Sequence, residues 1–199
     1  VAGLGSIDEY ERFVKAGADE FFCGYVPYSW SKKYGTVLPL NRREVLCYNV
    51  QLGAFEELRI LAAMIKKYGK PVHLTLYYIP EQYPEIAEII RCCMTIGFHS
   101  YIIADPALMV YLRENNVDCD LHISGETGEI NGRMVDAVAQ FHPKRLIFHR
   151  KNTFEDMASV IKNCKNKQQN LLSKQMYESG KEAKICEFEA FVLNELCQF

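Results

Sequence analysis

Short strand-like runs alternate with amphipathic helix patterns along this chain, and no other feature constrains its fold as much. The strand-like runs lie at 1–4, 20–25, 72–78, 101–104, 120–124, 145–149 and 187–193. The helix patterns between them lie at 6–17, 55–69, 84–97, 107–114, 131–141 and 153–162. Strands that alternate with helices are typical of a parallel sheet with crossover helices. We therefore expect an α/β fold, specifically a TIM-barrel-like (β/α) parallel barrel, with an open doubly wound sheet as the alternative.

Glycines mark where the helix patterns end. The first three patterns stop before Gly17, Gly69 and Gly97, and glycine is the residue that most readily takes the left-handed conformation closing a helix. We expect the chain to leave each helix there and enter the next strand.

The length of the chain limits how much of a barrel it can form. A complete barrel of eight strand–helix units needs about 250 residues, and this chain has 199. We expect one barrel-type domain over 1–199, truncated at its C-terminal end, with seven strands and six helices.

Two segments interrupt the alternation of strands and helices. Residues 26–53 form a long aromatic connection of the kind that is often functional, and residues 162–184 form a polar insertion or a partly helical excursion.

Composition excludes several classes of protein. The 23 Lys and Arg nearly balance the 25 Asp and Glu, which disfavours a strongly basic nucleic-acid clamp. No apolar run approaches the roughly 20 residues that span a bilayer, so we expect no membrane partner. Several of the eight cysteines lie in apolar runs, as in EIIRCCMTIG at 88–97. Such cysteines are typical of buried positions in a reducing compartment, and we expect a cytoplasmic protein.

Alternation within the strands predicts which side chains face the barrel interior. Apolar residues on one face of each strand must pack against the helices, so the residues between them point inward. Apart from Phe191, the inward residues of three strands are polar. They are His73, Thr75, Tyr77, His122, Ser124, Glu187 and Glu189, with Asp105 at the end of a fourth strand. Burying a carboxylate costs free energy unless it has a charge partner, hydrogen bonds or a water-filled cavity, so this set predicts a polar site. Barrel enzymes place such sites at the C-terminal mouth.

Arginines supply candidate contacts for an anionic substrate. Arg150 ends a strand, and Arg42 with Arg43 lies in the long connection. The common catalytic motifs are absent from the sequence: it has no H-E-x-x-H, no G-x-S-x-G, no phosphate-binding P-loop and no C-x-x-C pair. These absences disfavour a conventional zinc protease or serine hydrolase.

Five segments resemble one known family. They are VAGLGS, GADEFFCG, DLHISGETGEIN, KRLIFHR and EFEAFVLNELC, in the order and spacing found in the collagenase-like peptidases of unknown catalytic type, peptidase family U32. The chain departs from the family pattern at Gly125–Glu126, at Tyr77 and at Leu193–Asn194. These departures indicate a divergent subgroup.

The resemblance implies a barrel-like α/β domain and a peptidase or hydrolase label. Other members of the family act in hydroxylation of RNA bases or of the ubiquinone ring and carry an iron–sulfur cluster held by four cysteines. Cys197 matches the first of those cysteines, so a [4Fe-4S] cluster is implied for the full-length protein.

Three functions follow as hypotheses. In the first, a peptidase-family enzyme acts at the barrel mouth with His122, Glu187 and Glu189 as catalytic groups. Its substrate contacts would be Arg42, Arg43, His73, Tyr77, Asp105, Ser124 and Arg150. In the second, a cluster-dependent hydroxylation factor acts on RNA or an aromatic small molecule, with Cys197 as a cluster ligand. In the third, a non-catalytic barrel binds a small acid or a protein partner through the aromatic connection.

Overall fold

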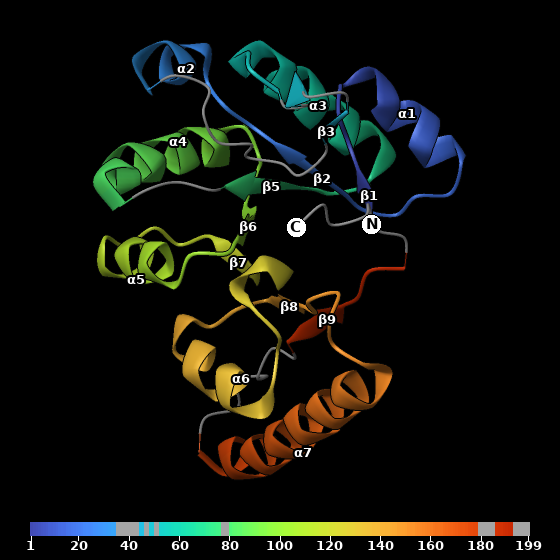
Figure 1. The fold of residues 1–199 in the computed structure, drawn as a ribbon, viewed down its shortest axis with the longest axis vertical. Coiled ribbons are helices and arrows are strands. Elements are labelled where there is room, and N and C mark those ends of the chain that lie inside the picture. The colour runs from blue at the N-terminus through green and yellow to red at the C-terminus, as the bar shows by residue number, and fades with distance from the viewer. Residues whose placement is uncertain (35–43, 46–47, 50–51, 77–79, 179–185, 193–199) are drawn as a thin grey trace. The chain divides into compact units, whose positions relative to one another are not determined.

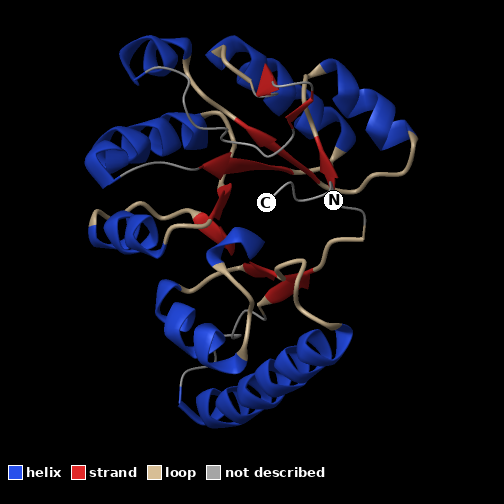
Figure 2. Ribbon diagram, viewed as in Figure 1, coloured by secondary structure: helices blue, strands red, loops and turns tan. Residues whose placement is uncertain are grey.

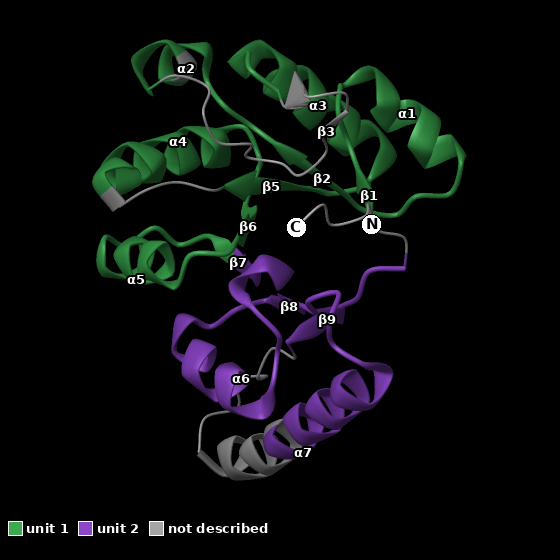
Figure 3. Ribbon diagram, viewed as in Figure 1, with its two compact units in different colours: residues 1–120 green, residues 121–199 purple. Residues whose placement is uncertain are grey.

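The structure is a computed structural model that describes residues 1–34, 44–45, 48–49, 52–76, 80–178 and 186–192. The chain divides into two compact units, residues 1–120 and residues 121–199 (Figure 3). We call them unit 1 and unit 2. Helices lie on one side of the strands in each unit (Figure 2). No helix in the described part of the chain is long and apolar enough to cross a membrane.

The expected α/β fold is confirmed, because parallel strands alternate with helices in both units (Figure 1), and the fold class is that of an incomplete barrel. The seven strands are β1 (Ala2–Gly3), β2 (Phe21–Gly24), β5 (Val72–Leu76), β6 (Ser100–Ile103), β7 (Asp120–Ile123), β8 (Arg145–Ile147) and β9 (Glu187–Glu189). In unit 1 the strand order is β1-β2-β5-β6, and in unit 2 it is β7-β8-β9. All seven expected strands form, most of them shorter than the apolar runs that predicted them.

The six expected helices also form. They are α1 (Asp8–Lys15), α3 (Phe55–Tyr68), α4 (Tyr83–Thr95), α5 (Pro106–Glu114), α6 (Gly132–Val138) and α7 (Phe154–Glu178). Short 3-10 turns lie at Pro80–Gln82, Gly125–Thr127 and Ala139–Phe141. Helix α7 continues well past residue 162, so the first part of the 162–184 segment is helical, and residues 179–185 lie outside the described residues.

The long connection after β2 contains structure that the sequence did not predict. Helix α2 (Tyr28–Tyr34) follows β2, and β3 (Glu44–Val45) pairs antiparallel with β4 (Tyr48–Asn49). The side chains of Lys33 and Tyr34 on α2 both bond to Glu85 of α4, with Lys33 Nζ 2.9 Å and Tyr34 Oη 2.8 Å from Glu85 Oε2. This contact fastens α2 to α4.

The core of unit 1 forms where the helices meet the apolar face of the strands. Tyr10 of α1 and Phe21 of β2 are fully buried, with ring centroids 4.8 Å apart. The buried Tyr10 hydroxyl donates to the Lys70 carbonyl oxygen at 2.6 Å, which satisfies its polar group. The expected glycine stops are confirmed, because the φ angles of Gly17, Gly69 and Gly97 are 96°, 70° and 105°.

The core of unit 2 is smaller and is centred on β8. Phe148, which follows β8, stacks on Phe188 of β9 with ring centroids 5.7 Å apart. Leu121, Ile123 and Leu146 bury almost completely beside them. These apolar residues occupy one face of the strands, so the residues between them occupy the other face.

Candidate functional site

The inner face of unit 2 carries a row of polar side chains across three strands. His122 of β7 lies opposite Arg145 of β8, and Arg145 lies opposite Glu187 of β9. Residues paired in a parallel sheet project to the same face, so these three share one layer. Ile147 pairs with Glu189 in the next layer. His122 is fully buried.

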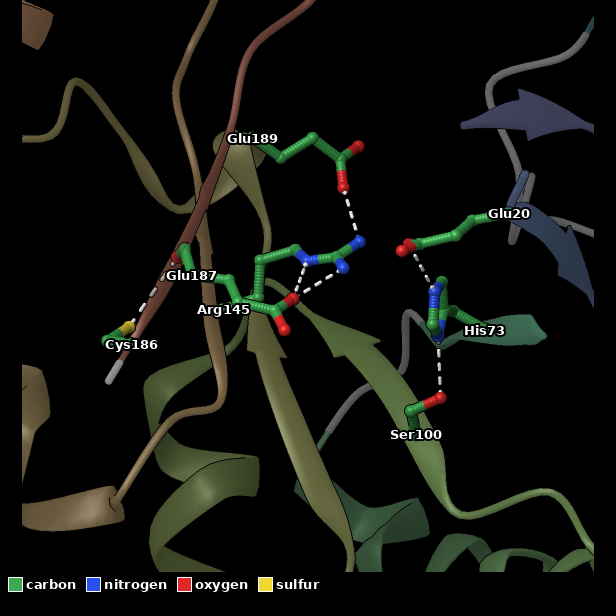
Figure 4. Close-up of polar contacts among 7 residues, drawn as sticks. All are labelled: Glu20, His73, Ser100, Arg145, Cys186, Glu187 and Glu189. Atoms are coloured by element: carbon green, nitrogen blue, oxygen red, sulfur yellow. Dashed lines mark hydrogen bonds and ion pairs between the residues drawn. The ribbon is translucent and has the colours of Figure 1, made fainter. Parts of the chain in front are cut away.

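Arg145 holds the two glutamates that the sequence predicted as catalytic (Figure 4). Its Nε lies 2.9 Å and its Nη2 2.5 Å from Glu187 Oε2, and its Nη1 lies 3.0 Å from Glu189 Oε2. The Arg145 side chain is only 9% exposed, against 48% for Glu187 and 19% for Glu189. A buried guanidinium needs anionic partners to offset its lost hydration, and the two carboxylates supply them.

The position of Glu187 along its strand differs from the expected one, whereas that of Glu189 does not. Glu187 is the first residue of β9 and Arg145 the first residue of β8, so this pair lies at the N-terminal ends of the strands. Glu189 is the last residue of β9. Alternation predicted the shared face of the two glutamates correctly. It could not locate them along the barrel, because the strand is only three residues long.

The loops at the carboxyl ends of β7 and β8 meet at a glycine. A Cβ atom on Gly125 would lie 2.9 Å from the carbonyl oxygen of Phe148, so only glycine allows this approach. Ser124, which follows β7, is buried, and its Oγ accepts a hydrogen bond from the Glu126 backbone nitrogen at 3.1 Å. The predicted substrate contact Ser124 thus shapes the turn that presents Glu126.

Glu126 and the predicted substrate contact Arg150 form an ion pair between these two loops. Glu126 Oε1 lies 3.6 Å from Arg150 Nη2, and the two side chains are 19% and 20% exposed. This separation exceeds that of a direct hydrogen bond, so the pair is held by charge. Both groups keep access to solvent at the carboxyl ends of the strands, where barrel enzymes bind their substrates.

A cavity of about 400 Å³ opens beside Arg150. Its polar walls are His149, Arg150, Asn152, Thr153 and Glu155, and its apolar walls are Phe154, Met157 and Phe191. This volume lies in the usual range for small-ligand sites, roughly 300–1,000 Å³. Phe154 is 86% and Phe191 44% exposed, although both are large aromatic residues. The cavity therefore offers a cation and aromatic surface to a ligand.

Asn152, which lines this cavity, is held by two hydrogen bonds to the backbone of Ile130. Its Nδ2 donates to the Ile130 carbonyl oxygen and its Oδ1 accepts from the Ile130 backbone nitrogen, each at 3.0 Å. Both residues are buried, and the loop after β8 is tied to the loop after β7 by these two hydrogen bonds. Asn131, one residue further, caps α6 by accepting from the backbone nitrogens of Arg133 and Met134.

Unit 1 contains two of the predicted substrate contacts. His73 of β5 lies between Ser100 and Glu20: its Nδ1 is 2.6 Å from Ser100 Oγ, and its Nε2 is 3.1 Å from Glu20 Oε2. Asp105 caps α5, where its Oδ1 accepts from the Ala107 backbone nitrogen at 2.9 Å. The Tyr83 hydroxyl donates to the other carboxylate oxygen of Asp105, and burial together with this bond raises the pKa of Tyr83. Asp105 thus has a clear structural role.

Four predicted site residues lie outside the described residues: Arg42, Arg43, Tyr77 and Cys197. Within the described part of the chain, no three His, Cys, Asp or Glu side chains are grouped to hold a metal ion. Burial raises the pKa of both Cys23 and Cys93 to about 12, so these thiols stay protonated near neutral pH. The resemblance placed the cluster ligand at Cys197, so the iron–sulfur cluster stays a prediction that the described cysteines do not test.

Comparison with known proteins agrees with this fold. The model of the family "Peptidase family U32" matches residues 5–199. The chain belongs to peptidase family U32. A solved structure titled the U32 peptidase Mk0906 superposes with a TM-score of 0.56 at 12% identity, covering 98% of this chain and 92% of that one. A glycerophosphodiester phosphodiesterase from Parabacteroides distasonis superposes with a TM-score of 0.52 at 12% identity, covering 93% and 84%. No curated protein matches the chain.

At such low identity the two structures establish only the fold of this U32 chain. The family resemblance inferred from the five short segments is confirmed by the family match. Sequence analysis missed Arg145, Glu126, Glu20 and Ser100 as partners of the predicted site residues. For Arg145 a signal was present, because it begins a strand and shares the face of Ile147, where an unpaired cation would be costly.

Proposed function

We propose that this U32 chain is a hydrolase that binds a carboxylate-bearing peptide in the cavity at the carboxyl ends of β8 and β9. The observation that supports this most is the Glu126–Arg150 pair beside a cavity with aromatic walls. A peptide with a free carboxylate and an apolar side chain matches both the charge and the surface of the cavity. The family membership supplies the reaction class.

Four residues in or beside the cavity have a task in this proposal. Arg150 binds the substrate carboxylate, because a planar guanidinium can donate two parallel hydrogen bonds to it. Phe154 and Phe191 cover the apolar part of the substrate. Glu126 takes a proton from the attacking water, because it lies at the carboxyl ends of the strands beside Arg150, whereas Glu187 and Glu189 accept hydrogen bonds from Arg145.

His122, Glu187 and Glu189 stay candidate proton-transfer groups that variants must test. A cytoplasmic location is supported by six described cysteines that are free thiols, which suits a reducing compartment. The hydroxylation alternative rests on Cys197, and no observation on the described residues adds to it.

A binding experiment tests the role of Arg150. The probe is hippuryl-phenylalanine, which has one free carboxylate and one large apolar side chain, and its matched control is the same compound with a C-terminal amide. Calorimetry should give a dissociation constant at least tenfold lower for the acid. One charge-assisted hydrogen bond contributes about 1.5–3 kcal/mol, or roughly a factor of 10–100.

Two arginine variants make the test specific. Arg150→Gln should remove the preference for the acid, whereas Arg133→Gln should preserve it, because Arg133 is an exposed arginine on α6 that does not line the cavity. Equal affinity of the wild type for acid and amide would contradict the proposal. So would a preference that survives in Arg150→Gln.

A further inference from the structure

We propose that Glu20, His73 and Ser100 in unit 1 form a second reactive site, in which Ser100 is an acyl-accepting nucleophile. The site goes beyond the function proposed above, since it uses neither the cavity nor the arginines of unit 2. The chemistry it supports is transfer of an acyl group from an ester to water through the Ser100 hydroxyl.

The geometry is that of a serine, a histidine and a carboxylate in series (Figure 4). His73 Nδ1 lies 2.6 Å from Ser100 Oγ, and His73 Nε2 lies 3.1 Å from Glu20 Oε2. Both distances fall in the range of about 2.6–3.2 Å that links a nucleophile to its base and the base to its orienting group. Serine hydrolases of unrelated folds share this series, which is recognised by geometry rather than by residue order.

Protonation chemistry sets the direction of the hydrogen bonds. An ionised carboxylate can only accept, so the neutral His73 ring must place its proton on Nε2, toward Glu20. Nδ1 then carries a lone pair, and the Ser100 hydroxyl must donate its proton to that nitrogen. Glu20 thereby positions the ring with its basic atom on the serine, as the acidic member of a triad does.

The fold places the three residues together through strand register. His73 is the second residue of β5, Ser100 begins β6, and Glu20 directly precedes β2. The pairing of Leu74 with Tyr101 puts His73 opposite Ser100. Burial is graded along the series: His73 is 5% exposed, the Glu20 side chain is 30% exposed, and Ser100 is half-buried. The base is shielded while the nucleophile keeps access to solvent.

The reaction balances with water as the only co-reactant. Ser100 Oγ bonds to the carbonyl carbon of an ester while His73 Nδ1 takes the hydroxyl proton, and the ester C–O bond then breaks as the alkoxide takes that proton. Water then attacks the acyl carbon while His73 Nδ1 takes a proton from it. The bond between the acyl carbon and Ser100 Oγ breaks, the proton passes to Ser100 Oγ, and the carboxylic acid leaves. Glu20, which lies across His73 from Ser100, disfavours anionic acyl donors, so the substrate class is uncharged esters.

Labelling by an alkyl fluorophosphonate tests this site, because such probes phosphonylate a serine only when a base activates it. Mass spectrometry of the folded, full-length chain should place the adduct on Ser100. The rate should fall roughly 10²–10⁴-fold in His73→Gln, the range for loss of a general base. Ser29→Ala, which removes an exposed hydroxyl from α2 in the same unit, should label at the wild-type rate.

Variants of Glu20 separate positioning from stability. Glu20→Gln should slow labelling at least tenfold, and Glu20→Asp should restore part of the rate. A purely structural carboxylate would change the unfolding temperature without this rescue. If His73→Gln fails to fold, Ser100→Cys is the variant to use, because it exchanges only the side-chain oxygen for sulfur. Its thiol should react with iodoacetamide faster than the exposed Cys92. Absence of a Ser100 adduct in the wild type, or equal labelling of Glu20→Gln and wild type, would overturn the proposal.

Discussion

Replacing Arg145 by Met should destabilise the chain by about 2–4 kcal/mol. Arg145 donates two hydrogen bonds to Glu187 and one to Glu189. Because the Glu187 side chain is 48% exposed, its pairing contributes only about 0–1 kcal/mol. The Glu189 side chain is 19% exposed, so its charge-assisted bond contributes about 1.5–3 kcal/mol. Because methionine keeps much of the apolar packing of the arginine stem, the decrease in unfolding free energy measures mainly the lost contacts of the guanidinium.

Urea unfolding followed by circular dichroism measures this loss. With a slope of about 2 kcal/mol per molar urea, the midpoint should fall by about 1–2 M. Replacing Glu187 and Glu189 by Gln as well should recover at least half of the loss, since no unpaired charge is then left near the core. Arg133→Gln, on the surface of α6, should leave the midpoint unchanged.

Two results would refute this explanation of the Arg145 contacts. One is a midpoint shift below about 0.3 M in Arg145→Met, which would mean that the buried guanidinium gains nothing from its partners. The other is a triple variant no more stable than Arg145→Met, because the cost would then lie in packing rather than in unpaired carboxylates.

Three further predictions concern other parts of the chain. Gly125→Ala should destabilise unit 2 by about 1–3 kcal/mol, because the new Cβ would meet the backbone of Phe148; a urea midpoint equal to wild type would contradict this. Iodoacetamide at pH 8 should modify exposed Cys92 but leave buried Cys93, whose pKa is raised to about 12, until urea unfolds the chain; peptide mapping checks the order. Hydrogen bonds from Lys33 and Tyr34 lower the pKa of Glu85 in the folded chain. The stability that these bonds add is therefore present above the unfolded-state pKa of Glu85 and is lost as the pH falls through its folded-state pKa. Glu85→Gln should weaken the dependence of the unfolding free energy on pH below about 4.5, and an unchanged dependence would contradict this explanation.

The strand and helix pattern was predictable because it depends on local chemistry. Alternating apolar residues in VHLTL predict a strand, and β5 (Val72–Leu76) forms there with all five residues buried. Gly17, Gly69 and Gly97 take the positive φ angles that end helices, and no tertiary contact is needed to make that choice. Family membership was predictable for the same reason, since short segments carry it.

The partners of the site residues were not predictable from local patterns. Glu187 and Glu189 were expected at the barrel mouth, but their contacts depend on the register that sets Arg145 opposite Glu187. The Glu20–His73–Ser100 series likewise depends on the pairing of β5 with β6, because His73 and Ser100 are 27 positions apart in the sequence. Alternation assigns a face to a side chain, whereas register and strand length decide what it touches.

Turnover of peptides with free carboxyl ends is the most direct test of the proposed hydrolase. Mass spectrometry of a defined peptide mixture should show cleavage by the wild-type chain and by Arg133→Gln. Arg150→Gln should lower kcat/KM at least tenfold, and Glu126→Gln should lower kcat by roughly 10²–10⁴-fold if Glu126 is the base. No cleavage by the wild type, or cleavage that Arg150→Gln and Glu126→Gln leave unchanged, would contradict a hydrolytic site at the carboxyl ends of β8 and β9.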